Sequence, residues 1–83
     1  MNKNIIEEKL IKILRKKNIK VNKTNKNIDL YKTDIIDSFD VISIIEDIDN
    51  LFKINLNLAE KKKIKFSINY LADNVLKKLK KNK

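Results

Sequence analysis

The chain has 83 residues, of which 42% are hydrophobic and 37% charged, and its formal net charge is +9. Histidine, cysteine and glycine are absent, which excludes the usual zinc ligands, Ser-His and Cys-His dyads, and phosphate-binding loops. We therefore expect a protein that is not an enzyme and holds no metal. The small size predicts one domain over residues 1–83. The polar start and the lack of a long apolar run indicate a cytoplasmic protein without a membrane span.

The first predicted element is an amphipathic helix over residues 4–17, because apolar side chains recur there at helical spacing. These side chains are Ile5, Ile6, Leu10, Ile11, Ile13 and Leu14. Residues 18–37 mix Asn, Lys and Thr with spaced apolar residues and show no sustained period, so we expect a long loop there. The loop is predicted to contact the core through Ile19, Val21, Ile28, Leu30, Ile35 and Ile36.

A second helix is predicted to begin at Asp37 or Ser38 and to end near Phe52. Asp37 and Asp40 are spaced as an N-cap residue and its partner three positions later, and both carboxylates suit the positive end of a helix. Acidic residues occupy one side of this helix. The other side is expected to be buried and contains Val41, Ile42, Ile44, Ile45, Ile48, Leu51 and Phe52.

Two further helices are predicted in the C-terminal third of the chain. A short third helix is expected within residues 54–63, around Leu56, Leu58 and Ala59. A last helix over residues 66–80 ends in lysines, which suit the negative pole of a helix. Its buried side is predicted to contain Ile68, Leu71, Ala72, Val75, Leu76 and Leu79, and packing roles are expected for Tyr31, Phe66 and Tyr70. Since glycine-containing hairpin turns are missing, the expected fold is an all-α, small four-helix bundle, three helices long and one short, with a long first loop.

The charges are unevenly distributed along the chain. Residues 1–28 and 51–83 are strongly basic, whereas residues 29–50 contain seven acidic residues and one lysine. Ser38 lies within this acidic segment. The residue types alone leave four roles open for it: a helix cap, a phosphorylation target, a nucleophile, or an attachment point for a group that the chain cannot supply.

The sequence Asp37-Ser38-Phe39-Asp40 resembles the Asp-Ser-Leu-Asp motif of acyl carrier proteins and of the related peptidyl and aminoacyl carrier domains. Residues 30–36 are similar to the loop that leads into this motif. The order of the predicted elements resembles that family over nearly the whole chain. It consists of a helix, a long loop, Asp-Ser at a helix start, an acidic second helix, a short connector and a closing helix.

The resemblance implies that Ser38 carries a 4'-phosphopantetheine arm, attached by a separate phosphopantetheinyl transferase that uses coenzyme A and a divalent metal. The thiol of the arm would hold acyl or aminoacyl groups as thioesters, so a chain without cysteine could still take part in thioester chemistry. The implied partners are an acyl- or aminoacyl-activating ligase and a downstream acyltransferase or synthase, while the length of the chain predicts a free-standing protein, expected to be a monomer. In this family the second helix contacts basic patches of partner enzymes, and the matching docking candidates are Asp37, Asp40, Glu46, Asp47 and Asp49.

The chain departs from the family pattern in three respects. It is basic outside residues 29–50, and Ser43 stands where the family commonly has an acidic residue that faces partners. These differences favour a specialised biosynthetic pathway over bulk fatty-acid synthesis. Asp34 replaces the family's usual glycine a few residues before the serine, and aspartate tolerates a left-handed backbone conformation better than most residues.

The main alternative is a small basic helical module that binds nucleic acid through contacts between lysines and phosphates. Its candidate residues are Lys61, Lys62, Lys63, Lys77, Lys78, Lys80 and Lys81. Against it, the most regular predicted helix presents acids where a recognition helix would present Arg, Asn or Gln, so we expect no nucleic-acid partner. A third interpretation, an adaptor whose basic ends touch anionic lipid, depends on charge alone.

Overall fold

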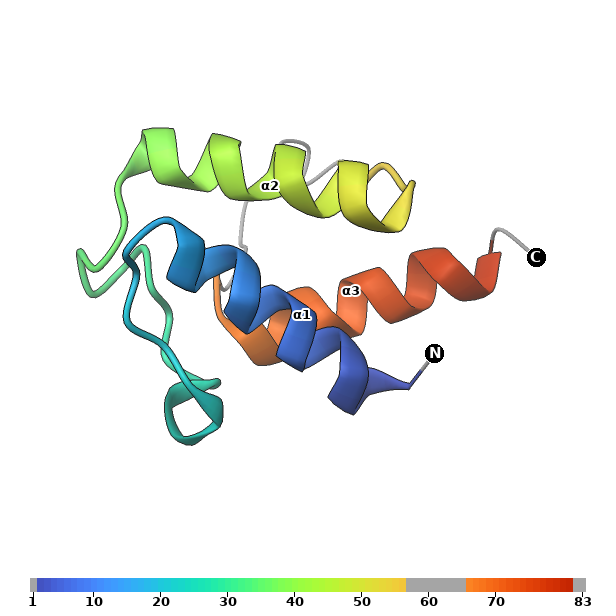
Figure 1. The fold of residues 1–83 in the computed structure, drawn as a ribbon, viewed down its shortest axis with the longest axis horizontal. Coiled ribbons are helices and arrows are strands. Elements are labelled where there is room, and N and C mark those ends of the chain that lie inside the picture. Colours follow the sequence, from blue (N-terminus) through green and yellow to red (C-terminus); the bar gives the residue numbers. More distant parts are fainter. Residues whose placement is uncertain (1, 57–65, 82–83) are drawn as a thin grey trace.

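Three α-helices and one short 3-10 helix form the regular structure of the described residues, 2–56 and 66–81, of the computed structural model (Figure 1). The elements are α1 (Lys3–Lys16), the 3-10 helix η1 (Lys23–Asn25), α2 (Ser38–Phe52) and α3 (Ile68–Lys81). These residues contain no strand, which confirms the predicted all-α class. Within the predicted short third helix, residues 54–56 are not helical, and residues 57–63 lie outside the described part of the chain.

α1 begins and ends where side-chain and backbone groups satisfy its free N–H and carbonyl groups. Asn2 is the N-cap, and its Oδ1 accepts a hydrogen bond of 3.0 Å from the Ile5 N–H, which starts the helix one residue earlier than predicted. After α1 the chain turns through Asn18, whose φ is 63°, and the Ile19 N–H donates to the Leu14 carbonyl. This bond belongs to a Schellman motif, which directs the buried Ile19 side chain into the core.

α3 begins two residues later than predicted, because Ser67 caps its N-terminus. Ser67 Oγ accepts a hydrogen bond of 3.2 Å from the Tyr70 N–H, and the Ser67 carbonyl accepts one of 2.9 Å from the Leu71 N–H. Ser67 and its neighbour Phe66 are both buried. The start of α3 is therefore fixed within the protein interior.

The core lies between the three helices. α1 packs against both α2 and α3, and α2 crosses above the other two helices in Figure 1. On α2 the buried residues Ile44, Ile48 and Phe52 recur every four positions along one side. The main contributions of α1 and α3 are Ile6, Leu10, Leu14, Ile68, Leu71, Ala72 and Val75. This single apolar layer fixes α2 on the other two helices.

The loop between α1 and α2 covers one end of the core. Ile28 and Ile35 are exposed, so the prediction that they contact the core is wrong. Ile35 and Ile36 lie in a bend just before α2, where Ile36 is buried and its neighbour Ile35 faces solvent. The prediction is confirmed for the other four residues, which are Ile19, Val21, Leu30 and Ile36.

Hydrogen bonds attach the second half of this loop to the segment around the start of α3. The Leu30 N–H donates to the Phe66 carbonyl at 2.9 Å, and the Asn69 N–H donates to the Lys26 carbonyl at 2.9 Å. Asn69 Nδ2 also donates to Asn27 Oδ1 at 2.9 Å. The approach to α2 is thus fixed to α3, which is distant in sequence.

A buried carboxylate connects the loop to α1 as well. Glu7 is only 3% exposed, and its Oε2 lies 3.7 Å from Lys26 Nζ. No hydrogen bond to Oε2 is present among the described residues. The ion pair is therefore the interaction that compensates the buried charge, and it holds the loop against α1.

Several other apolar residues predicted to be buried are exposed. Ile42 and Leu51 of α2 are 62% and 49% exposed, and Ile5 and Tyr31 are exposed as well. A helix rotates by about 100° per residue, so Ile42 lies about 200° from Ile44 and points away from the core. Isoleucine occurs on nearly every side of α2, and hydrophobicity alone does not separate the two sides.

Lys53 ends α2 in a left-handed conformation, with a φ of 54°. A residue with a Cβ atom is disfavoured there, whereas glycine is not. We expect Lys53→Gly to raise the free energy of unfolding by about 0.5–1 kcal/mol, measured by urea denaturation. Lys77→Gly is the control, because Lys77 lies within α3 and the same replacement should lower that free energy by about 1 kcal/mol. Effects of the same sign would contradict this expectation.

Candidate functional site

Ser38 is the first residue of α2, and a capping box formed by Asp37 and Asp40 fixes this start. Asp37 Oδ1 accepts a hydrogen bond from the Asp40 N–H at 2.9 Å, and Asp40 Oδ2 accepts one from the Asp37 N–H at 3.2 Å. Both carboxylates lie at the positive end of the helix dipole. The predicted start of the second helix and the capping roles of both aspartates are confirmed.

The Ser38 side chain is exposed and takes no part in this cap. Because Asp37 is the N-cap, the interpretation of Ser38 as a helix cap is wrong. No hydrogen bond among the described residues involves Ser38 Oγ. The other two serines of the chain are engaged: Ser67 is buried as the cap of α3, and Ser43 Oγ accepts a hydrogen bond from Lys17 Nζ. Ser38 is therefore the serine whose hydroxyl is free to react.

A compact turn leads into Ser38. The Asp34 N–H donates to the Tyr31 carbonyl at 3.2 Å, and the Ile36 N–H donates to the Leu30 carbonyl at 3.1 Å. Asp34 has a φ of 60°, in the left-handed range that aspartate tolerates better than most residues. These bonds and the burial of Leu30 fix the direction from which the chain enters α2.

Two of the acidic residues predicted to dock partners contact the protein itself. Asp47 Oδ2 lies 2.8 Å from Lys17 Nζ, which also donates to Ser43 Oγ at 2.6 Å. Ser43 therefore lies beside α1 and not on the outer side of α2. Asp49 Oδ1 accepts a hydrogen bond of 3.1 Å from the Leu56 N–H. Together with the capping box, these contacts engage four of the five predicted docking residues.

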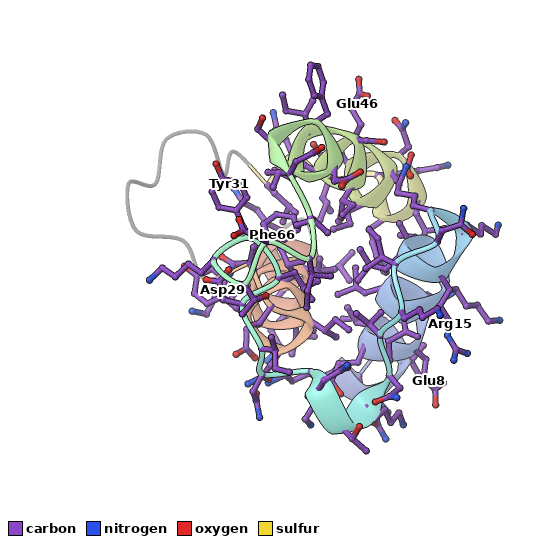
Figure 2. All side chains as sticks on the ribbon, turned by 90° about the vertical axis from the view of Figure 1, so that its left-hand side faces the viewer. Glu8, Arg15, Asp29, Tyr31, Glu46 and Phe66 are labelled. Atoms are coloured by element: carbon purple, nitrogen blue, oxygen red, sulfur yellow. The ribbon has the colours of Figure 1, made fainter. Side chains whose placement is uncertain are left out.

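Glu46 is the fifth docking candidate, and it differs from the others. It is exposed, forms no hydrogen bond or ion pair within the described part of the chain, and points away from α1 and α3 in Figure 2. The exposed side chains of Phe39 and Ile42 precede it by seven and four positions, and so all three share one side of α2. Phe39 is 81% exposed, which is unusual for a residue of its size.

The sequence-based reasoning missed Phe39 and Ile42 as surface residues near the serine. The available signal was their spacing relative to Glu46, which places them opposite the buried side of α2. Tyr31 and Ile35, in the turn before α2, are also exposed. An apolar surface thus borders Ser38, in addition to the predicted acids.

The described residues offer few features of a metal site, a membrane span or a nucleic-acid site. They contain no group of three or more His, Cys, Asp or Glu side chains placed to hold a metal ion. No helix in these ranges combines the length and hydropathy needed to cross a membrane. Of the lysines considered for nucleic-acid binding, Lys77 and Lys80 are exposed and Lys78 is half-buried on α3. The side chains of the others lie outside the described part, and they are Lys61, Lys62, Lys63 and Lys81.

Comparisons with known proteins give no match: no protein-family model, no curated protein and no solved structure matches this chain. The functional argument therefore depends on the residues around Ser38. They provide an exposed hydroxyl, a helix N-terminus fixed by two aspartates, and an adjoining apolar and acidic surface.

Proposed function

We propose that the protein is a carrier of acyl or aminoacyl groups, modified with 4'-phosphopantetheine on Ser38. The observation that supports this most directly is the exposed serine, free of hydrogen bonds to other described residues, at the first position of a helix with a well-fixed start. The similarity of Asp37-Ser38-Phe39-Asp40 to the carrier-protein motif adds to it. The basic composition outside residues 29–50 favours a specialised biosynthetic pathway.

The surroundings of Ser38 fit a covalently attached phosphate. A phosphodiester on its Oγ would lie at the N-terminus of α2, where the helix dipole favours negative charge. The exposure of Ser38 leaves room for a substituent that extends into solvent. When attached, the arm would supply the thiol that forms thioesters, which this cysteine-free chain lacks.

The chain's own contribution to modification would be the presentation of one hydroxyl. The capping box holds the first turn of α2, so Ser38 Oγ has a defined position for the transferase. In the transfer, Ser38 Oγ would form a bond to phosphorus as the pyrophosphate bond of coenzyme A breaks and the nucleotide half leaves. The serine proton would pass to a general base, which we assign to the transferase because the carboxylates of Asp37 and Asp40 are engaged in the capping box.

Partner enzymes would contact the outer side of α2, next to the modified serine. Phe39 and Ile42 offer apolar area there, and Glu46 offers a charge that no internal contact neutralises within the described residues. Aromatic side chains contribute strongly to protein interfaces, and charges at the rim chiefly raise association rates. The other acidic candidates would act mainly through the long-range electrostatic potential of the protein, because internal contacts already engage their carboxylates.

We expect Glu46→Lys to slow phosphopantetheinylation about two- to fivefold, because an exposed charge pair contributes about 0.2–1 kcal/mol. The initial rate would be measured at limiting transferase, and the difference from wild type should shrink at high salt. Glu8→Lys is the control for net charge on α1, where Figure 2 shows Glu8 pointing outward and away from α2, and its ion-pair partner Lys23 lies outside α2. Equal slowing in both variants would indicate an effect of net charge and would contradict a docking role of Glu46.

The experiment that tests the proposed function is intact-protein mass spectrometry of the full chain. The protein would be incubated with coenzyme A, magnesium and a broad-specificity phosphopantetheinyl transferase, next to a known carrier protein. One added phosphopantetheinyl group is expected in the wild type and in Ser43→Ala, which alters the serine beside α1. A chain that gains no mass while the known carrier is modified would overturn the proposal.

A further inference from the structure

A groove lies between α1 and the C-terminal half of α2, with a volume of about 600 Å³. Asp47 on its wall is nine positions from Ser38, or about 13 Å along the helix axis. Asp47 and Lys17 also form an ion pair in this groove, at 2.8 Å. The remaining lining residues are Lys9, Lys12, Ile13, Lys16, Asn50 and Leu51.

Three lysines of the groove lack a counter-ion among the described residues. Lys9, Lys12 and Lys16 form no hydrogen bond or ion pair with other described residues. They share one side of α1 and extend over about 10 Å of its axis. Like charges at these spacings repel each other, and the pair of Lys17 and Asp47 adds no net charge. The groove therefore favours an anionic ligand.

Exposed apolar side chains accompany these lysines. Leu51 is half-exposed on the α2 wall, and Ile5 is exposed one helical turn before Lys9. The headgroup layer of an anionic bilayer offers both phosphates and apolar depth for such residues. The phosphate backbone of a nucleic acid offers charge, but no aromatic side chain lines the groove to stack on bases. The composition thus fits anionic lipid better than nucleic acid.

We propose that this groove binds the phosphate headgroups of anionic phospholipids, with Ile5 and Leu51 entering the interfacial layer of the bilayer. A lysine close to an anionic surface contributes about fivefold to partitioning, so three unpaired lysines give reversible, salt-sensitive binding. Arg15, which Figure 2 shows pointing outward from α1, adds a further positive charge near this side. The inference goes beyond the proposed carrier function, since the groove does not include Ser38 and requires no modification.

The test is co-sedimentation of the unmodified full chain with vesicles. Vesicles of equal parts phosphatidylserine and phosphatidylcholine should bind the protein at low salt and release it at high salt. Pure phosphatidylcholine vesicles should not bind it. Absence of binding to the phosphatidylserine vesicles at low salt would overturn the proposal.

Matched variants separate the groove from net charge. Lys12→Gln combined with Lys16→Gln should lower partitioning about twentyfold, because two of the unpaired lysines are removed. Lys77→Gln combined with Lys78→Gln, on α3 outside the groove, changes net charge equally and should lower it less than about threefold. Equal losses in the two pairs would overturn the assignment to the groove.

Two soluble probes distinguish the bilayer from other sources of phosphate. Glycerophosphate at the same phosphate concentration should not displace the protein from vesicles, because it lacks the apolar layer that Leu51 would enter. A mixed-sequence DNA duplex should bind more weakly than the anionic vesicles. Tighter binding to the duplex, lost on Lys12→Gln with Lys16→Gln, would overturn the lipid assignment in favour of nucleic acid. Each outcome is independent of Ser38, so a failure here leaves the test of the carrier function intact.

Discussion

Ser38→Ala should abolish phosphopantetheinylation completely and leave the free energy of unfolding within about 0.5 kcal/mol of the wild type. Loss of modification is expected because the variant removes the one serine hydroxyl that is both exposed and free of hydrogen bonds among the described residues. Stability should be unchanged because Asp37, and not Ser38, caps α2. Intact mass after incubation with coenzyme A and transferase gives the first quantity, and urea denaturation gives the second.

Asp37→Ala is the control for this prediction. It removes the side chain that accepts the Asp40 N–H, and so should lower the free energy of unfolding by about 1 kcal/mol while Ser38 remains present. The two variants thus separate a chemical role at position 38 from a structural role at position 37. A mass gain retained in Ser38→Ala would assign the attachment to another residue and would contradict the proposed site.

The second large effect is expected at Leu30, whose truncation to alanine should lower the free energy of unfolding by about 2–5 kcal/mol. Leu30 is 1% exposed, and it is the buried anchor of the turn that leads into α2. A chain of this size has a total stability of only about 4–12 kcal/mol. Urea denaturation should therefore show a marked shift of the midpoint, with little change in the slope.

Ile35→Ala is the matched control for Leu30→Ala. Ile35 belongs to the same turn, but about half of its surface is exposed, so its truncation should cost less than about 1 kcal/mol. A similar loss in both variants would mean that the turn is not anchored specifically by Leu30. Circular dichroism before denaturation would show whether both variants keep the helical signal.

The sequence predicted the long helices because their apolar residues recur at helical spacing and because polar residues mark their starts. Asp37 and Asp40 are the clearest case, since their spacing indicated a capping box that the structure contains. The start of α3 was predicted two residues too early. The apolar Phe66 was counted with the apolar residues of the helix, although it precedes the cap residue Ser67. Phe66 is buried although it precedes the helix, and its carbonyl accepts a hydrogen bond from the Leu30 N–H of the loop.

Tertiary contacts account for most of what the sequence did not reveal. The acidic segment is continuous in sequence, yet Asp47 and Asp49 contact Lys17 and Leu56, which lie just after α1 and just after α2. Backbone hydrogen bonds such as that from Leu30 leave no trace in residue type. Periodicity alone also cannot identify the exposed side of α2, because isoleucine occurs on both sides.

The groove between α1 and α2 could not be predicted from the sequence, because it depends on how the two helices pack together. The spacing of the α1 lysines is visible in the sequence, but Leu51 and Asn50 line the same groove only because α2 packs beside α1. Burial of Glu7 was likewise unpredictable, since its partner Lys26 lies in a loop without a regular period. Such pairings are properties of the packed chain.

The unpaired lysines of α1 and the acidic start of α2 give the protein an electric dipole moment that its net charge does not convey. A charged support or interface would therefore select an orientation as well as attract the molecule. On a cation exchanger the chain would adsorb through the lysines of α1 and α3, and the hydroxyl at position 38, at the acidic start of α2, would remain accessible to soluble enzymes. Its sequence pI of about 9.8 thus describes only the average of two chemically different faces.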